Sequence, residues 1–169
     1  SLAMLIKENQ ARFAGWNFEI IATDLDEKIL DQAQKGRFSQ FEVQRGLPIT
    51  HLVKYFTQDQ DAWVLNDEIK RMVTFRPLNL LDSFAALTGC DIVFCRNVLI
   101  YFDKETKAKI FKKIYDILPD NGYLVLGGAE TVLGVTDMFK PLPERGSGYV
   151  KDKAPESAYK DNESLASAS

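Results

Sequence analysis

The stretch Asp91–Asp103, DIVFCRNVLIYFD, contains an unbroken apolar run that ends abruptly in polar side chains. Its first part, residues 91–95, predicts a strand that is buried on both faces of a parallel sheet. Arg96 and Asn97 follow directly, and burying such side chains without partners costs several kcal/mol. We therefore expect both to lie at a cleft beyond the end of the strand. The alternative is a structural Arg96 that pairs with an acidic neighbour.

Outward from this stretch, apolar strands alternate with amphipathic helices. Asp103 is placed to cap a helix that runs to Leu118 and carries apolar residues along one face. The alternation predicts an α/β domain with a mainly parallel sheet. The expected elements are a helix at 1–12, a strand at 18–22, a helix at 25–35, strands at 72–75 and 91–95, the helix at 103–118, and strands at 123–126 and 148–151.

The periodicity weakens between residues 36 and 76, which contain an aromatic patch at Phe38 and Phe41, a Gly-Leu-Pro turn and short helical patterns. We interpret this region as a subdomain inserted into a domain that spans residues 1–152. Residues 153–169 are rich in Ser, Ala, Lys, Asp and Glu and have no apolar period, so they predict a flexible C-terminal tail.

Composition excludes several classes of function. The chain has 169 residues, 46% of them hydrophobic, and a formal net charge of -3, which argues against nucleic acid as a partner. No apolar stretch reaches the roughly 18 residues that a membrane span requires, and there is no signal-peptide pattern. We expect Cys90 and Cys95 to be reduced core thiols, and the protein to be cytoplasmic and without membrane insertion.

Motifs for phosphate, metal and hydrolytic chemistry are missing from the sequence. It contains neither GxGxxG nor GxxxxGK[ST], and no carboxylate pair suited to a metal, which argues against a nucleotide hydrolase and predicts no metal site. We expect Gly127-Gly128 to allow a close backbone approach. His51, the only histidine, is assigned to the surface, so a histidine-dependent hydrolase is disfavoured.

Polar residues also follow the other predicted strands. Asp24 is placed to accept hydrogen bonds from both hydroxyls of a ribose, or else to cap the next helix. The amide of Asn79 and the backbone amide of Leu80 can read an adenine edge, although an asparagine here also suits a local turn. Tyr101, four residues after Asn97, either lines the same cleft or packs in the core.

Four ordered segments together resemble the chemotaxis-receptor methyltransferases: ATDLD (22–26), EVQRGLP (42–48), FRPLNLLD (75–82) and DIVFCRNVLIYFD (91–103). The resemblance implies a Rossmann-like methyltransferase sheet with a small inserted antiparallel β subdomain. It also implies an enzyme that transfers a methyl group from S-adenosylmethionine to glutamate side chains on the cytoplasmic domains of chemotaxis receptors, with S-adenosylhomocysteine as product.

The resemblance assigns roles to individual residues. Asp24 would hold the ribose, Asn79 and Leu80 the adenine region, and Arg96 and Asn97 the nucleoside and the methionine side of the cofactor. Tyr101 would sit beside the sulfonium methyl, which makes Tyr101 and Arg96 the expected catalytic residues. A further set, Gln44, Arg45, Gly46 and Leu47, would form a partner-binding surface, with a plain turn and helix start as the alternative.

The chain also departs from the family pattern. In the family, a helical domain, a first strand and a glycine-containing loop precede the point that corresponds to Ser1, so we expect an N-terminally truncated methyltransferase with impaired cofactor binding. Without that strand, the strands ending at Asp24 and Arg96 would each have an open edge, and we expect self-association or exchange of elements. Two rival hypotheses are a binding module without catalysis and a methyltransferase for another carboxylate.

Overall fold

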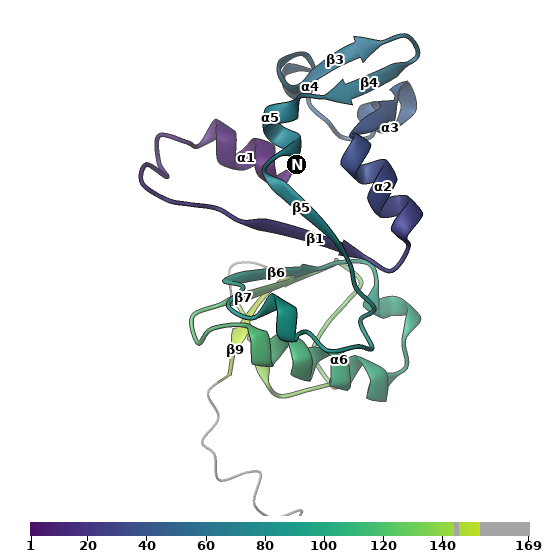
Figure 1. The fold of residues 1–169 in the computed structure, drawn as a ribbon. Coiled ribbons are helices and arrows are strands. Elements are labelled where there is room, and N and C mark those ends of the chain that lie inside the picture. The colour runs from purple at the N-terminus through teal and green to yellow at the C-terminus, as the bar shows by residue number, and fades with distance from the viewer. Residues whose placement is uncertain (144–145, 153–169) are drawn as a thin grey trace, which may run out of the picture. The chain divides into compact units, whose positions relative to one another are not determined.

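The computed structural model describes residues 1–143 and 146–152, which form two compact units. Unit 1 comprises Ser1–Asn79, and unit 2 begins at Leu80 (Figure 1). The predicted flexible tail, residues 153–169, lies outside the described residues.

Unit 1 is built on a parallel pair of strands, β1 (Ile20–Asp24) and β5 (Val73–Pro77). The preceding helix α1 (Leu2–Glu8) packs into the unit's core through Ala3 and Met4. Helix α2 (Glu27–Lys35) contacts both strands and ends at Gly36, whose φ of 62° is the left-handed conformation that glycine adopts without strain. The sequence therefore predicted the end of this helix correctly and the strand two residues too early.

A small antiparallel sheet occupies the middle of unit 1, with strand order β2-β4-β3. Its strands are β2 (Arg37–Ser39), β3 (Phe56–Asp59) and β4 (Ala62–Leu65), accompanied by helices α3 (Gln40–Gln44), α4 (Ile49–Tyr55) and α5 (Asp67–Lys70). Phe56, Leu52 and Tyr55 share one core with α1. The expected antiparallel subdomain is thus present within residues 37–65, whereas β5 pairs in parallel with β1.

Unit 2 contains a four-stranded sheet with the order β6-β7-β9-β8. Strands β6 (Ile92–Cys95) and β7 (Tyr123–Leu126) are parallel, while β8 (Phe139–Pro141) and β9 (Gly148–Lys151) add antiparallel pairs. The remaining elements are the 3-10 helices η1 (Ala85–Leu87) and η2 (Leu99–Tyr101) and the helix α6 (Lys104–Ile117). Asp103 caps α6 by accepting a hydrogen bond from the Thr106 N–H at 2.8 Å, as predicted.

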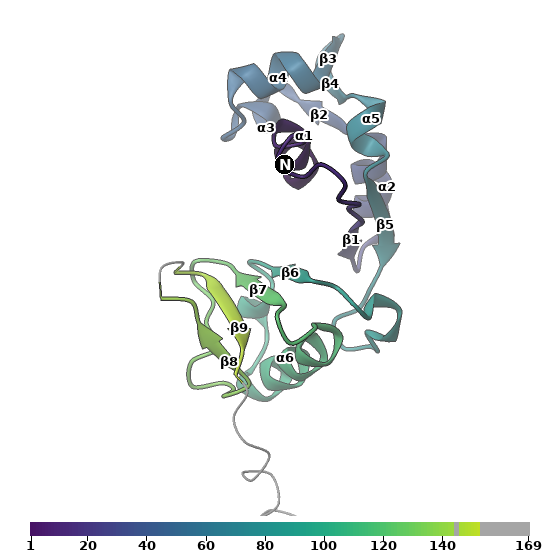
Figure 2. The same cartoon turned by 90° about the vertical axis from the view of Figure 1, so that its left-hand side faces the viewer.

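Helix α6 lies along one face of the sheet in unit 2 (Figures 1 and 2). Its apolar side chains are buried, as are Leu124 and Leu126 on the strand β7. On β6, however, Ile92 and Phe94 are each 52% exposed, because alternate side chains of a strand point to opposite faces. The prediction that this strand is buried on both faces was therefore wrong for unit 2, where α6 covers one face.

The strands β1 and β6 are each paired along one edge. Strand β1 is hydrogen-bonded to β5 and β6 to β7, and within residues 1–143 and 146–152 neither has a second strand partner. The open edges that the sequence led us to expect are thus present in the described part of the chain. Strand β8 was not predicted, because its three residues lie in a stretch without a period-2 pattern.

Candidate functional site

Asp24 is the last residue of β1 and is exposed. Its Oδ1 accepts a hydrogen bond from the backbone N–H of Asp26 at 2.9 Å, which forms a local turn. The cap of α2 is Asp26, whose own side chain accepts from the N–H of Lys28 at 2.8 Å. The alternative that Asp24 caps the helix was therefore wrong, and its carboxylate stands at the carboxyl end of a parallel strand.

Asn79 and Leu80 follow β5, and both are half-buried. The backbone continues the parallel pairing for one more step, since the N–H of Leu78 donates to the carbonyl of Asp24 at 2.9 Å. The carbonyl oxygens of Leu80 and Leu81 accept hydrogen bonds from Lys113 Nζ of α6, at 3.1 and 2.6 Å. These bonds involve the carbonyl of Leu80, whereas the role that the resemblance implies concerns its N–H.

Arg96 and Asn97 follow the last residue of β6, and both are exposed. Asn97 has a φ of 59°, a left-handed conformation that asparagine tolerates better than most residues. The turn approaches Gly127 closely: a Cβ at Gly127 would lie 2.5 Å from Asn97 Oδ1 and 2.9 Å from Asn97 N. The expectation of a close backbone approach at Gly127 is confirmed.

Glu130 holds this turn and was missed by the sequence analysis. The residue is only 9% exposed. Its carboxylate accepts backbone hydrogen bonds on both oxygens: Oε2 from Asn97 and Gly127, both at 2.7 Å, and Oε1 from Val98 at 2.9 Å and Leu99 at 2.7 Å. Burial alone raises the pKa of Glu130, but these four N–H donors outweigh it and hold the pKa below its ordinary value. Glu130 is therefore a carboxylate at neutral pH.

Cys95, the last residue of β6, is buried and free, as predicted. Burial and, to a lesser extent, the nearby charge of Glu130 raise the pKa of the Cys95 thiol to about 12. Since the thiolate is the nucleophilic form, Cys95 is inert at neutral pH. The other cysteine, Cys90, is half-buried and donates to the carbonyl of Leu87 at 3.0 Å.

Tyr101 ends the 3-10 turn η2 and is 81% exposed. The alternative that its ring packs in the core of unit 2 was wrong, because Leu99 of the same turn fills the buried position at 1% exposure. A tyrosine this exposed can present its hydroxyl to a ligand. The cofactor and catalytic roles of these strand-end residues stay predictions.

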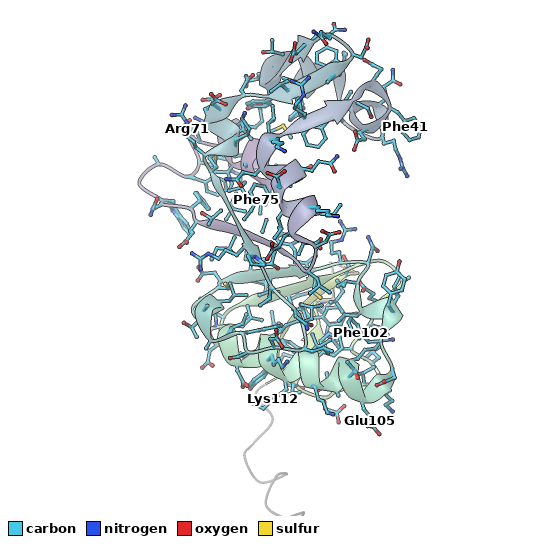
Figure 3. All side chains as sticks on the ribbon, turned by 45° about the vertical axis from the view of Figure 1, so that its right-hand side comes forward. Phe41, Arg71, Phe75, Phe102, Glu105 and Lys112 are labelled. Atoms are coloured by element: carbon cyan, nitrogen blue, oxygen red, sulfur yellow. The ribbon has the colours of Figure 1, made fainter. Side chains whose placement is uncertain are left out.

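The predicted partner-binding segment lies at the end of α3. Gln44 is the last residue of that helix, Arg45 caps it, and Gly46 turns the chain with a φ of 92°. Leu47 instead packs against the core of unit 1. The Arg45 guanidinium lies 5.5 Å from the centre of the Phe41 ring, and Phe41 is 68% exposed (Figure 3). The exposed part of the segment is therefore Gln44 to Gly46.

His51, assigned to the surface, is half-buried in α4, with its ring centre 6.0 Å from that of Tyr55.

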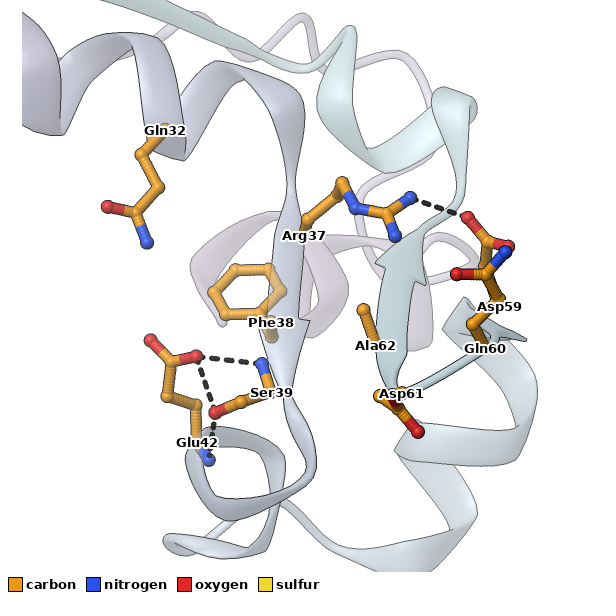
Figure 4. Close-up of a pocket in the computed structure, with 9 residues that line it drawn as sticks. All are labelled: Gln32, Arg37, Phe38, Ser39, Glu42, Asp59, Gln60, Asp61 and Ala62. Carbon is orange, nitrogen blue, oxygen red and sulfur yellow. Dashed lines mark hydrogen bonds and ion pairs between the residues drawn. The ribbon is translucent and has the colours of Figure 1, made fainter.

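An open pocket of about 300 Å³ lies on the antiparallel sheet of unit 1 (Figure 4). Its polar lining residues largely bond to one another: Arg37 pairs with Asp59 at 2.6 Å, and Glu42 Oε2 accepts from the N–H and hydroxyl of Ser39. Residues predicted to bind the cofactor do not line it. These contacts tie the polar side chains of the pocket to one another within the antiparallel subdomain.

In the part of the chain that the structure describes, no group of His, Cys, Asp and Glu side chains is arranged to hold a metal ion. None of the helices within the same residues is both long and apolar enough to cross a lipid bilayer.

The chain was compared with protein families and with curated proteins. Residues 1–146 match the family described as CheR methyltransferase, SAM binding domain. The chemotaxis protein methyltransferase of Vibrio parahaemolyticus is 39% identical over 143 residues, 83% of this chain and 52% of that protein. Chemotaxis protein methyltransferase 1 of Pseudomonas aeruginosa is 39% identical over 144 residues, 83% and 53% of the two chains. Chemotaxis protein methyltransferase 2 of Vibrio cholerae is 34% identical over 166 residues, which cover 96% of this chain and 57% of that protein.

Similarity to solved structures is weaker. The structure of the LepI complex with SAM has a TM-score of 0.44 and 15% sequence identity, covering 80% of this chain and 26% of that one, too low to carry an argument. The family match covers every segment on which the resemblance rests, and the chain spans about half the length of the curated relatives it matches. The chain therefore belongs to the CheR methyltransferase family and corresponds to its SAM-binding domain.

Proposed function

We propose that the protein to which this chain belongs is a protein-glutamate O-methyltransferase that acts in the cytoplasm on the cytoplasmic domains of chemotaxis receptors. The main support for the proposal is that the match to the family covers residues 1–146. This range includes the polar residues at the ends of the strands, Asp24, Asn79 and Arg96–Asn97. The relatives that are 34 to 39% identical to the chain are named chemotaxis protein methyltransferases, which supports the substrate class.

The residues present fit S-adenosylmethionine. A ribose offers two hydroxyl donors, which suit an exposed carboxylate at the end of a parallel strand such as Asp24. Asn79 has both an amide donor and a carbonyl acceptor for an adenine edge. Asn97, in its left-handed turn, and Arg96 present exposed polar groups at the end of β6 for the rest of the cofactor. When bound, the cofactor supplies a sulfonium methyl group.

The chain's own residues would then act by positioning. The acceptor glutamate, with an ordinary pKa of about 4.3, is ionised at neutral pH and requires no general base. Tyr101 would donate a hydrogen bond that holds the acceptor carboxylate in line with the methyl group, and Arg96 would orient charged groups without exchanging a proton. Holding two reactants in such a geometry contributes roughly 7 to 11 kcal/mol in favourable cases.

The receptor would dock on the end of α3 and on α4. Gln44, Arg45 and Gly46 are exposed, and exposed apolar side chains lie on both helices: Phe41, Ile49 and Val53, each 68% exposed. Ile49 and Val53 are four residues apart and share one face of α4. An exposed aromatic side chain beside an arginine, as at Phe41 and Arg45, is typical of protein interaction sites.

The test uses the full-length protein. Titration calorimetry measures S-adenosylhomocysteine binding, and transfer of labelled methyl groups to a receptor cytoplasmic domain measures activity. Binding with receptor methylation supports the proposal. Binding without methylation of any protein favours a binding module, and methylation of a small carboxylate alone favours the other acceptor class. Phe41→Ser should reduce receptor methylation and leave S-adenosylhomocysteine binding unchanged, because Phe41 lies outside the cofactor residues.

We also propose that the 169-residue chain self-associates through its open strand edges. Strand β6 has an unpaired edge among the described residues, and its outward face carries Ile92 and Phe94, each 52% exposed. Unpaired, apolar edges are templates for pairing with another chain. Light scattering should give a mass above 19.1 kDa that rises with concentration. A stable monomer at every concentration contradicts this proposal.

A further inference from the structure

The turn after β6 is organised by a buried charge. Glu130 is 9% exposed, and its carboxylate accepts hydrogen bonds from four backbone N–H groups. Three of these belong to consecutive residues, Asn97 to Leu99, and the fourth to Gly127. Glu130 comes 33 residues after Asn97 in the sequence, so the carboxylate ties the loop after β7 to the end of β6. Hydrogen bonds to charged groups are stronger than those between neutral groups.

This carboxylate determines which hydrogen-bonding groups of the turn are available to a ligand. Consecutive backbone N–H groups that point to one spot form a ready binding site for phosphate or carboxylate groups. Here the N–H groups of Asn97, Val98 and Leu99 are already bonded to Glu130. The exposed side chains of Arg96 and Asn97 are then the groups at the end of β6 that can recognise a ligand.

The same contacts impose the backbone geometry that presents Asn97. A residue at a φ of 59° needs surrounding structure to keep it there. The Asn97 N–H is held at 2.7 Å by Glu130 Oε2, which also accepts from Gly127 at 2.7 Å. Gly127 leaves room for this contact, because a Cβ there would come within 2.6 Å of the same oxygen.

We propose that Glu130 is a positioning residue for cofactor binding: it acts through the backbone of residues 97–99 to present Arg96 and Asn97 to the nucleoside. This role rests on the proposed function. It requires that Glu130 touch no ligand atom and that its effect depend on Asn97.

The test is the isosteric variant Glu130→Gln in the full-length protein. An amide keeps one acceptor oxygen and places an NH₂ donor against two backbone N–H donors, so two hydrogen bonds are lost with almost no change in volume. We expect S-adenosylhomocysteine to bind at least about tenfold more weakly, the factor for one lost hydrogen bond to a charged group. Amide exchange at residues 97–99 should accelerate while α6 stays protected.

Glu105→Gln is the matched control, since it removes the same charge from an exposed position at the start of α6 in the same unit. It should leave both the affinity and the exchange at residues 97–99 unchanged. Accelerated exchange in Glu130→Gln at unchanged affinity overturns the positioning role and leaves Glu130 purely structural. Unchanged exchange and affinity also overturn it. If the wild-type protein itself binds no S-adenosylhomocysteine, both the proposed function and the role of Glu130 are overturned. Failure of the Glu130 role alone differs from this, because the wild type then still binds S-adenosylhomocysteine.

A second measurement separates positioning from general destabilisation. Asn97→Gly removes the side chain, and glycine adopts a positive φ without strain. If Glu130 acts through Asn97, then adding Glu130→Gln to Asn97→Gly weakens binding by a smaller factor than Glu130→Gln alone. Equal factors in both backgrounds contradict the proposed route. All comparisons are made where urea titration shows each variant to be folded.

Discussion

Gly127→Ala should be among the most damaging small substitutions in unit 2. The added Cβ would lie 2.5 Å from Asn97 Oδ1, 2.6 Å from Glu130 Oε2 and 2.9 Å from Asn97 N. Contacts this short cannot be kept, so the loop after β7 or the turn after β6 must move. The exposed Asn97 side chain can move its Oδ1 away, but Glu130 Oε2 is fixed by two backbone hydrogen bonds and Asn97 N belongs to the backbone.

The cost follows from these two effects. Forcing one extra carbon into a closely packed site costs about 1 to 3 kcal/mol. Weakening the two hydrogen bonds that Oε2 accepts adds about 1 to 3 kcal/mol. The free energy of unfolding should therefore fall by about 2 to 6 kcal/mol, a large share of the roughly 5 to 15 kcal/mol typical of a domain. Gly128→Ala is the control, because a Cβ there meets nothing within 4 Å.

Native-state hydrogen exchange of the α6 amides measures the opening of unit 2 directly. Trp16 and Trp63, the only tryptophans, both lie in unit 1, so their fluorescence follows that unit separately. Gly127→Ala should lower the protection of α6 strongly, and Gly128→Ala should change it by less than about 1 kcal/mol. If the α6 amides are equally protected in the two variants, the close approach at Gly127 does not constrain the fold and the reasoning is wrong.

Further predictions concern charge, packing and catalysis. Because folding lowers the pKa of Glu130, its carboxylate contributes its full stabilisation at pH values above the ordinary glutamate pKa. This stabilisation is lost as the pH falls through the lower pKa of the folded state, so acid unfolding should be less steep in Glu130→Gln than in the wild type. Leu124→Ala, at a position with 0% exposure, should cost about 2 to 5 kcal/mol, while Phe94→Ala on the uncovered face should cost about 1 kcal/mol or less, as measured by urea unfolding. Tyr101→Phe in the full-length protein should lower kcat by roughly 10- to 100-fold at nearly constant affinity for S-adenosylhomocysteine, since one hydrogen bond to a charged acceptor is lost; equal losses in both would assign Tyr101 to binding.

Local patterns predicted most of the elements correctly. The helix cap at Asp103, the helix end at Gly36 and the strand at Tyr123–Leu126 depend on residues within a few positions of one another, so their signals can be read along the chain. Where two residues compete for one local role, the sequence was less decisive. Asp24 and Asp26 both suit the cap of α2, and the backbone geometry gives the cap to Asp26.

The placement of polar residues at strand ends was also determined by the sequence, because an apolar run that stops at Asp24 or Arg96 leaves the next side chain beyond the sheet. The tertiary structure alone decided what holds those ends in shape. Glu130 accepts hydrogen bonds from backbone N–H groups of residues 31 to 33 positions earlier in the chain. Because every residue except proline has the same backbone N–H group, no sequence pattern indicates which carboxylate will bind these groups. The sequence also did not predict the exposed outer face of β6, because the apolar pattern of a strand is the same whether or not a helix covers that face.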